Sequence, residues 1–326
     1  MAAPLTERLD QGAVLGDGGY LLELERRGYV QAGPFTPEVS LTSPSALAEI
    51  HREFLRAGAD VLQALTFYAS PEKLGTVGLA DKVEDLNRTA VEIARSVAAE
   101  GDALVAGNVC LTWEYDPAEK SSADRVRSIF ERQLEIQLDV GIDFLVAETF
   151  TFTGEAEIAT RCAKEAGLEV VTTMSFEKEP HSYEGDSAAD CARKLQDAGA
   201  DVVGLNCLRD PAHTLPLMKE MREAVSGPLA CQPVAYRVPD QSPDFTSLPE
   251  FPLGLDPLQL TRQEMGDFAV QAQDMGIDYI GSCCGSVASH VRAMAVALGK
   301  APAQMREWRS QGKPMSAYEY HSHSSL

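Results

Sequence analysis

Long apolar stretches are absent from this chain of 326 residues. No run approaches the roughly 20 apolar residues that a helix needs to cross a bilayer, which excludes a membrane-spanning protein. The amino-terminal stretch MAAPLTERLDQGAVLGDGG also lacks the basic segment, apolar segment and small-residue cleavage site of a secretory signal. We therefore expect a cytoplasmic protein.

Basic residues are scarce relative to acidic ones. The chain has 28 lysines and arginines against 49 aspartates and glutamates, which gives a formal net charge of -21 at pH 7. A surface of this sign repels a phosphate backbone, so nucleic acid is not an expected partner. The acidity otherwise indicates solubility and does not indicate a fold.

Cysteine is sparse and odd in number. The seven cysteines are Cys110, Cys162, Cys191, Cys207, Cys231, Cys283 and Cys284. Small secreted domains instead carry a dense and even set that pairs into disulfides. We expect reduced thiols here. Four of them, Cys110, Cys162, Cys191 and Cys231, are interpreted as small buried apolar residues.

One junction recurs along the chain, with the order glycine, apolar residue, aspartate. It stands at 58–60, 141–143, 199–201 and 276–278, each time after an amphipathic stretch and before a short apolar run. Glycine adopts the left-handed conformation that ends many helices, and the following runs are rich in Val, Ile, Leu and Phe. Each junction therefore predicts a loop from a helix to a strand.

Eight apolar runs have the length of strands, at 13–19, 60–67, 103–109, 144–150, 169–176, 201–207, 228–235 and 279–285. Amphipathic stretches alternate with them, for example at 43–58, 83–101, 123–141 and 261–276. Apolar strands that alternate with helices favour parallel pairing with both faces covered. We predict an α/β fold of the (β/α)₈ TIM-barrel type over residues 1–300, with an open doubly wound sheet as the alternative. Residues 301–326 are predicted to be a short carboxyl-terminal extension.

Two segments between strands and helices are unusually long, at about 28–42 and 235–260. The second contains Phe245, Leu248, Phe251 and Leu253, which would be unfavourable in contact with water. We expect both segments to act as lids or walls over a site.

Polar residues stand where the predicted strands end, which is where the active site of a (β/α)₈ barrel lies. In chain order they are Asp17 with Gly18 and Gly19, Thr66 with Phe67 and Tyr68, Asn108, Glu148, Asn206 with Cys207, Gln232, and Cys283 with Cys284. Three cysteines are thus expected at one rim.

These three cysteines could bind a zinc ion. Strands six and eight are separated by one strand, so their axes should lie roughly 10 Å apart, a gap that inward side chains can span. Three thiolates would leave a fourth zinc position free, as catalytic zinc sites do. Adjacent residues of a strand face opposite sides, so Cys283 and Cys284 could both bind only where the strand has ended, between Gly281 and Gly285. A vicinal disulfide remains the alternative.

Several stretches of the chain resemble the homocysteine S-methyltransferase family, and particularly its betaine-homocysteine branch. They are LGDGGYLLELERRGYVQAGPFTPE (15–38), HREFLRAGADVLQALTFYAS (51–70), EGDALVAGNV (100–109), GLNC (204–207), LPEFPLGLDP (248–257) and YIGSCCG (279–285). The resemblance implies zinc-dependent transfer of a methyl group to homocysteine, giving methionine. It also implies that Cys207, Cys283 and Cys284 are the zinc ligands.

Rim position and the resemblance together suggest roles for further residues. Glu148, assisted by Asp17, is the candidate for the homocysteine ammonium, and the backbone of Gly18 and Gly19 could approach the substrate closely. A methylated cation has no N–H donor and is usually bound by aromatic faces. Phe35, Phe67 and Tyr68 are the candidates for the donor cation. The Tyr68 phenol is also a candidate for the vacant zinc position and counts with the cysteines as catalytic.

The donor pocket departs from the betaine branch at two positions. Phe35 stands where that branch has tryptophan, and Thr149 where it has tyrosine. The favoured donor is a quaternary ammonium compound such as glycine betaine. The first alternative is an enzyme specific for a sulfonium donor, such as S-methylmethionine or a dimethylsulfonio acid. The second alternative is a non-catalytic zinc or thiol redox sensor. A barrel metallohydrolase is disfavoured because none of the six histidines stands at a predicted strand end. Homo-oligomerisation is left open.

Overall fold

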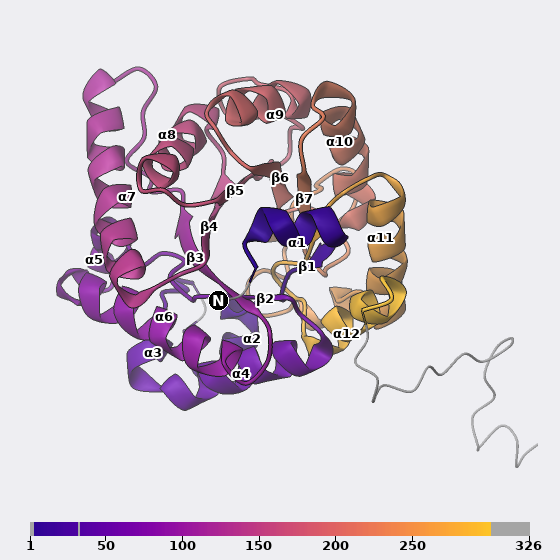
Figure 1. Ribbon diagram of the computed structural model, residues 1–326, viewed down its shortest axis with the longest axis horizontal. Helices are drawn as coiled ribbons and strands as arrows, with labels where there is room; N and C mark the ends of the chain where they lie inside the picture. The colour runs from indigo at the N-terminus through magenta and orange to yellow at the C-terminus, as the bar shows by residue number, and fades with distance from the viewer. Residues whose placement is uncertain (1–2, 32, 301–326) are drawn as a thin grey trace, which may run out of the picture.

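The computed structural model describes residues 3–31 and 33–300 of the chain. Its strands are β1 (Val14–Leu15), β2 (Val61–Gln63), β3 (Leu104–Cys110), β4 (Phe144–Phe150), β5 (Val170–Met174), β6 (Val202–Asn206), β7 (Leu229–Gln232) and β8 (Tyr279–Ile280). In this described part, all eight strands belong to one parallel sheet with the order β1-β8-β7-β6-β5-β4-β3-β2. Figure 1 looks along this ring of strands, with the helices around it.

The first half of the chain contains the helices α1 (Leu5–Gln11), α2 (Leu21–Arg26), α3 (Val39–Thr42), α4 (Pro44–Ala57), α5 (Pro71–Gly75), η1 (Ala80–Lys82), α6 (Val83–Ala98), α7 (Lys120–Val140) and α8 (Thr153–Glu165). The second half contains α9 (Ala188–Asp197), α10 (Pro211–Ala224), η2 (Phe245–Ser247), η3 (Asp256–Leu258), α11 (Arg262–Asp274) and α12 (Ala288–Ala297). Here η denotes a 3₁₀ helix.

The barrel closes at both its inner and its outer layer. The outer helices contact one another in the order α4, α6, α7, α8, α9, α10, α11 and α12, and α12 contacts α4 again. Inside this ring, the Asp60 N–H donates to the Leu15 carbonyl at 2.8 Å and links β2 to β1. The predicted (β/α)₈ barrel is therefore confirmed, and the alternative of an open sheet is wrong.

The recurring glycine-apolar-aspartate junctions are helix-to-strand loops, as predicted. Gly58, Gly141, Gly199 and Gly276 all have a positive φ, between 74° and 107°. Each junction aspartate then accepts a hydrogen bond from a backbone N–H in the preceding strand. The pairs are Asp60 with Leu15 (2.7 Å), Asp143 with Val105 (2.7 Å), Asp201 with Val170 (2.8 Å) and Asp278 with Leu229 (3.0 Å). These carboxylates tie the strands together in pairs at the amino-terminal end of the barrel.

Helix α1 covers this amino-terminal end (Figure 1). Its Leu5 and Leu9 pack into a buried apolar cluster that has at least one residue from every strand. The Glu169 carboxylate anchors the helix by accepting the N–H groups of Leu5 at 2.7 Å and Thr6 at 3.2 Å. Each buried leucine contributes about 2 kcal/mol of burial free energy. Since this end is packed with side chains, the opposite end is the place for a site.

Some local expectations differ from the structure. The strands β1, β2 and β8 are shorter than the apolar runs that predicted them, because their carboxyl-terminal residues turn into the rim. In the 235–260 segment, Phe245 and Leu248 are buried as expected, whereas Leu253 is 75% exposed and that expectation is wrong. Leu253 lies in the turn at 249–253, which directs its side chain outward. The expected extension at 301–326 lies outside the described residues.

Across residues 3–31 and 33–300, none of the helices combines the length and the apolar character that crossing a membrane requires.

Replacing a junction aspartate should destabilise the barrel. The change Asp201→Ala leaves the buried Val170 N–H without its acceptor and removes the Lys164 ion pair, so we expect a loss of about 2 kcal/mol in unfolding free energy. Urea denaturation measures this loss. The change Asp197→Ala, at the exposed end of α9, is the control and should cost less than about 0.5 kcal/mol. Equal losses in the two variants would contradict the assigned role.

Candidate metal centre and substrate cavity

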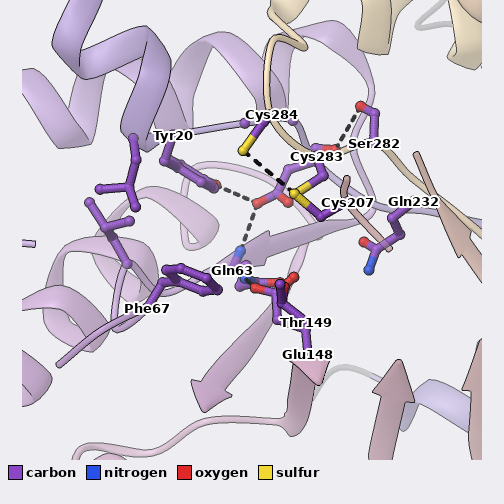
Figure 2. Close-up of a pocket in the computed structure, with 15 residues that line it drawn as sticks. Tyr20, Gln63, Phe67, Glu148, Thr149, Cys207, Gln232, Ser282, Cys283 and Cys284 are labelled. Carbon is purple, nitrogen blue, oxygen red and sulfur yellow. Dashed lines mark hydrogen bonds between the residues drawn. The ribbon is translucent and has the colours of Figure 1, made fainter. Parts of the chain in front are cut away.

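A cavity opens at the carboxyl ends of the strands (Figure 2). It is lined by the residues that end or follow the strands, together with the start of α2. They are Asp17, Gly18, Gly19, Tyr20, Leu21, Gln63, Leu65, Phe67, Glu148, Thr149, Cys207, Gln232, Ser282, Cys283 and Cys284. Most of the site residues expected from the sequence thus share one cavity. Phe35 and Tyr68 are not among the residues that line it.

The backbone that follows β7 holds both cysteine segments in place. The Cys207 N–H donates to the Gln232 carbonyl at 2.9 Å, and the Cys283 N–H donates to the Pro233 carbonyl at 2.9 Å. Two residues further on, the Ala235 N–H donates to the Cys284 carbonyl at 2.8 Å. Because β7 lies between β6 and β8, the same short segment brings the three cysteines together.

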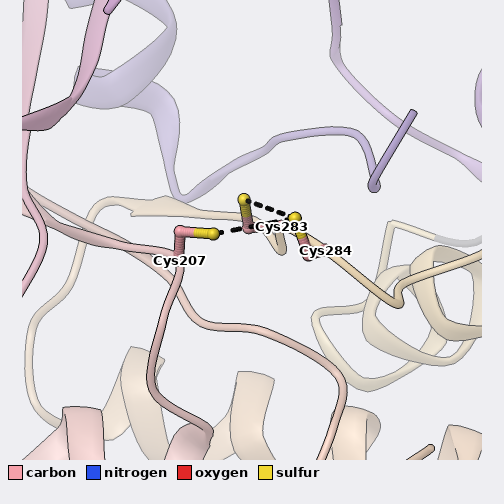
Figure 3. Close-up of side chains that lie close together, drawn as sticks. All are labelled: Cys207, Cys283 and Cys284. Carbon is pink, nitrogen blue, oxygen red and sulfur yellow. Dashed lines mark hydrogen bonds between the residues drawn. The ribbon is translucent and has the colours of Figure 1, made fainter. Parts of the chain in front are cut away.

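The three sulfurs point toward one another (Figure 3). The Sγ atoms of Cys207 and Cys284 are 3.7 Å apart, those of Cys283 and Cys284 are 4.0 Å apart, and all three lie within 4.8 Å of one another. Tetrahedral ligands with Zn–S bonds of about 2.3 Å lie about 3.8 Å from each other. The arrangement fits three zinc ligands. It does not fit a vicinal disulfide, whose sulfurs are about 2.05 Å apart.

The backbone of this rim is strained at several positions, two of which, Thr149 and Cys207, line the cavity. Among the described residues, the non-glycine positions with positive φ are Phe35, Tyr68, Trp113, Thr149, Cys207 and Leu208. All six stand at or beyond the carboxyl ends of strands. Cys207 adopts the left-handed conformation, with a φ of 55°, and lines the cavity, while the preceding Asn206 donates to Glu148 in the cavity wall. Such strain is typical of functional sites.

Two glycines allow close approaches at this rim. A Cβ atom on Gly19 would lie 2.7 Å from the Cys283 carbonyl oxygen, so a side chain there would displace the loop from the cysteine pair. Gly285 has a φ of 79°, and a Cβ atom on it would lie 2.5 Å from the Tyr236 ring. The loop that carries Cys283 and Cys284 therefore requires glycine at two places: at position 19, which packs against the loop, and at position 285, within the loop itself.

The protons of the three thiols are distributed unequally. Thiol hydrogen bonds from Cys283 and Cys284 hold the pKa of Cys207 well below its usual value. The same hydrogen bonding to Cys207 raises the pKa values of Cys283 and Cys284, and burial raises them further. One thiolate is thus stable at this position, and three adjacent thiolates require a cation to balance their charge.

Glu148 and Asp17 form a pair of buried carboxylates beside the thiols. Glu148 accepts from Gln63 Nε2 at 2.6 Å, Asn108 Nδ2 at 2.7 Å and Asn206 Nδ2 at 2.8 Å. The backbone N–H of Gln63 donates to Asp17 at 2.7 Å, so Gln63 contacts both carboxylates. Burial raises the pKa of each carboxyl to about 7.

This pair has the properties of an ammonium site. Amide groups hold the carboxylates in place, and neither carboxylate forms an ion pair within 4.0 Å with a lysine, arginine or histidine among the described residues. A buried carboxylate without a cation is unfavourable, so a ligand ammonium would stabilise the charged form of both groups. The cavity can therefore take a molecule that carries an ammonium group and a sulfur.

Asp17 also has neighbours that sequence reasoning missed. The Tyr20 hydroxyl donates to the Asp17 carboxylate and lies 3.0 Å from Nδ1 of the buried His51. Burial lowers the pKa of His51 to about 3, which keeps the imidazole neutral. His51 belongs to the amphipathic helix α4, where the sequence gives no signal that it faces the site.

The candidate aromatic residues divide into two groups. The rings of Phe67 and Tyr68 lie 4.3 Å apart, and Tyr68 also contacts Trp113 at 5.3 Å between ring centroids. Phe35 instead packs on Phe251 at 6.2 Å, in the apolar cluster beside Cys283 and Cys284. Trp113 was not a candidate from the sequence, since it lies three residues beyond the strand β3.

Comparison with known proteins identifies similar chains. The sequence matches the family model described as homocysteine S-methyltransferase over residues 14–298. It is 45% identical over 302 residues to the betaine–homocysteine S-methyltransferase 1 of Xenopus laevis, covering 89% of this chain and 74% of that protein. It is 41% identical over 298 residues to the S-methylmethionine–homocysteine S-methyltransferase BHMT2 of Mus musculus, covering 89% and 80%.

A solved structure shares the fold. The metallated form of the homocysteine methyltransferase MmuM from Escherichia coli matches with a TM-score of 0.73 and 22% sequence identity. The match covers 90% of this chain and 99% of that one. At this identity, the likeness supports the barrel architecture.

Removing any one of the three cysteines should abolish zinc binding. We expect about one zinc ion per chain in the protein as purified, and less than about a tenth of that after Cys207→Ala, because two thiolates hold zinc much more weakly than three. Elemental analysis of the dialysed proteins measures the zinc. The change Cys231→Ala, in the neighbouring strand β7, is the control and should keep the ion. Equal zinc contents in both variants would contradict the assigned ligand.

Asp17 should make the substrate-free protein less stable as the pH rises. Its pKa of about 7 lies above that of an unfolded aspartate, so the folded protein retains a proton that the unfolded chain loses between about pH 4 and pH 7. We expect Asp17→Asn to match the original protein near pH 4 and to exceed its stability by about 2 to 4 kcal/mol at pH 8. Urea denaturation at both pH values tests this. The exposed control Asp10→Asn should follow the original protein at both, and a pH-independent gain for Asp17→Asn would refute the account.

Proposed function

Because this chain belongs to the homocysteine S-methyltransferase family, we propose that it transfers a methyl group from glycine betaine, or a related onium donor, to homocysteine, giving methionine. One observation supports this proposal above the others: three converging thiols lie beside two buried carboxylates that have no cationic partner in the part of the chain that the structure describes. Homocysteine carries the thiol and the ammonium that such a cavity would bind.

Homocysteine would be held at its amino-acid end. Glu148 and Asp17 accept the ammonium, and their amide partners keep the carboxylate oxygens in position. The backbone at Gly19 passes close to the cysteine pair, and Gly18 and Gly19 both line the cavity, where the substrate carboxylate would lie against them. The homocysteine side chain then extends toward the sulfur trio. Fixed orientation of this kind lowers the entropic part of the barrier.

The cysteine trio would supply the metal site. Cys207, Cys283 and Cys284 are the proposed zinc ligands, which leaves one tetrahedral position free. Bound zinc would keep the homocysteine thiol deprotonated at neutral pH.

The methyl transfer needs no general acid. The homocysteine sulfur forms a bond to the methyl carbon while the carbon–nitrogen bond of the donor breaks, and its electron pair stays on nitrogen. The amine leaves as a neutral molecule and takes no proton. In keeping with this, none of the described residues that line the cavity is a histidine, and the buried His51 behind Tyr20 is neutral.

The donor would bind against aromatic faces. Phe67 lines the cavity, and Tyr68 packs on it and lies within electrostatic reach of Cys207 and Cys284, whose charges raise the Tyr68 pKa after the larger effect of burial. Phe35, which packs against the same apolar cluster as Cys283 and Cys284, completes the proposed set. As a hypothesis, the Tyr68 phenol occupies the fourth zinc position when homocysteine is absent.

The identity of the donor rests on the names of the relatives. A relative named for betaine is 45% identical to this chain, and a relative named for S-methylmethionine is 41% identical. A sulfonium donor is therefore the second candidate. The seven free thiols fit a reducing compartment, and we propose a cytoplasmic location.

The proposed reaction is tested by methionine formation from homocysteine with a panel of onium donors, with and without a chelator. We expect turnover that the chelator abolishes and zinc restores. Glu148→Gln should raise the homocysteine KM about tenfold and leave the donor KM unchanged, because one charged hydrogen-bond partner of the ammonium is lost. Tyr68→Phe should raise the donor KM instead.

Each outcome discriminates between the candidate functions. Turnover with sulfonium donors alone would favour the second candidate. A zinc-loaded protein that makes no methionine from any donor would refute both and leave the thiol sensor. A variant away from the cavity, such as Glu157→Gln on the outer helix α8, is the control and should change neither KM.

A further inference from the structure

Lys73 is a buried lysine that the proposed reaction does not use. It lies on α5, in the segment after β2, and only 2% of its surface is exposed. Its Nζ atom is fully buried and has no hydrogen-bond partner among the described residues. An ammonium group in such a place is costly, so its position calls for an explanation.

Two aromatic rings surround this ammonium. Lys73 Nζ lies 3.8 Å from the centroid of the Tyr68 ring and 2.9 Å from that of the Trp113 ring. Trp113 is 62% exposed at the rim, and Tyr68 packs on Phe67 in the cavity wall. Tyr68 thus connects Lys73 directly to the region proposed for the donor.

The surroundings of Lys73 act on its charge in two opposite directions. Burial lowers its pKa to about 7, while the charges of Cys110 and Glu155 act to raise it. The faces of the two rings add a further attraction for the charged form. Below about pH 7, the wall of the donor region therefore contains a cation that no neighbouring carboxylate within 4.0 Å neutralises in the described residues.

We propose that Lys73 selects methyl donors by their net charge, favouring zwitterions over donors that carry a net positive charge. The inference rests on the proposed methyl transfer and goes beyond it. Glycine betaine and dimethylsulfonioacetate each carry one onium and one nearby carboxylate, so their net charge is zero. S-methylmethionine carries a sulfonium, an ammonium and a carboxylate, and its net charge is +1.

The size of the effect follows from the distance across one ring. An onium about 4 Å from the opposite face of Tyr68 would lie about 8 Å from the Lys73 ammonium. Two unit charges about 8 Å apart, at an effective dielectric constant of about 20, change an equilibrium roughly 30-fold. The carboxylate cancels most of this repulsion for a zwitterion, whereas in S-methylmethionine the additional ammonium balances the carboxylate and one positive charge is left. Allowing for screening, we expect discrimination of about tenfold.

The test compares two sulfonium donors, which share the same leaving-group chemistry. The measured quantity is the ratio of kcat/KM for dimethylsulfonioacetate to kcat/KM for S-methylmethionine, with homocysteine saturating. We expect Lys73→Met to lower this ratio about tenfold, chiefly by improving the use of S-methylmethionine. The ratio does not depend on the fraction of folded enzyme, because both donors report on the same active molecules.

Matched variants separate charge from packing. Lys73→Gln, a second neutral replacement, should lower the ratio as Lys73→Met does, and Lys73→Arg should retain it. Lys82→Met removes a lysine charge at the exposed end of η1 and should leave the ratio unchanged. If Lys73→Met reduces both donors by the same factor, Lys73 is a packing residue and the inference is wrong. If the unmodified enzyme methylates homocysteine with none of the donors, the proposed function itself fails.

Discussion

The convergence of three thiols on one point is the constraint around which the rim is organised. Cys207 follows β6, and Cys283 and Cys284 follow β8, so neither segment could form the group alone. The backbone after β7 makes hydrogen bonds to both segments and sets their separation. The left-handed conformation of Cys207 and the glycines around the cysteine pair are local conditions for this arrangement.

Charge balance explains much of what surrounds the thiols. The thiols and the two buried carboxylates can all become negative, and burial makes that state unfavourable without cations. A zinc ion and a substrate ammonium would each relieve part of this cost. Without these ligands, the buried negative groups lower the free energy of unfolding, and ligand binding would restore part of it. Lys73, when protonated, adds a positive charge on the side of the aromatic wall.

The prediction from sequence was most successful where a short pattern implies a local structure. The glycine-apolar-aspartate junctions identified helix ends, and eight apolar runs identified the barrel. It was least successful where contacts join distant segments. Tyr20 and His51 lie 31 positions apart and meet beside Asp17, and no periodicity indicates this. Trp113 and Lys73 escaped notice for the same reason, and Leu253 was misjudged because a turn decides its exposure.

The sequence by itself determined the order of the elements, the barrel and the set of residues that stand at strand ends, because these depend on periodicity and on neighbours in the chain. It could not determine which of those residues share a cavity. Only the tertiary structure decided that Phe67 lines the cavity while Phe35 packs on Phe251, and that Gln63 joins Asp17 to Glu148. The physical reason is that such contacts depend on strand register and on the exact point where each strand turns, which side-chain packing across the whole barrel sets.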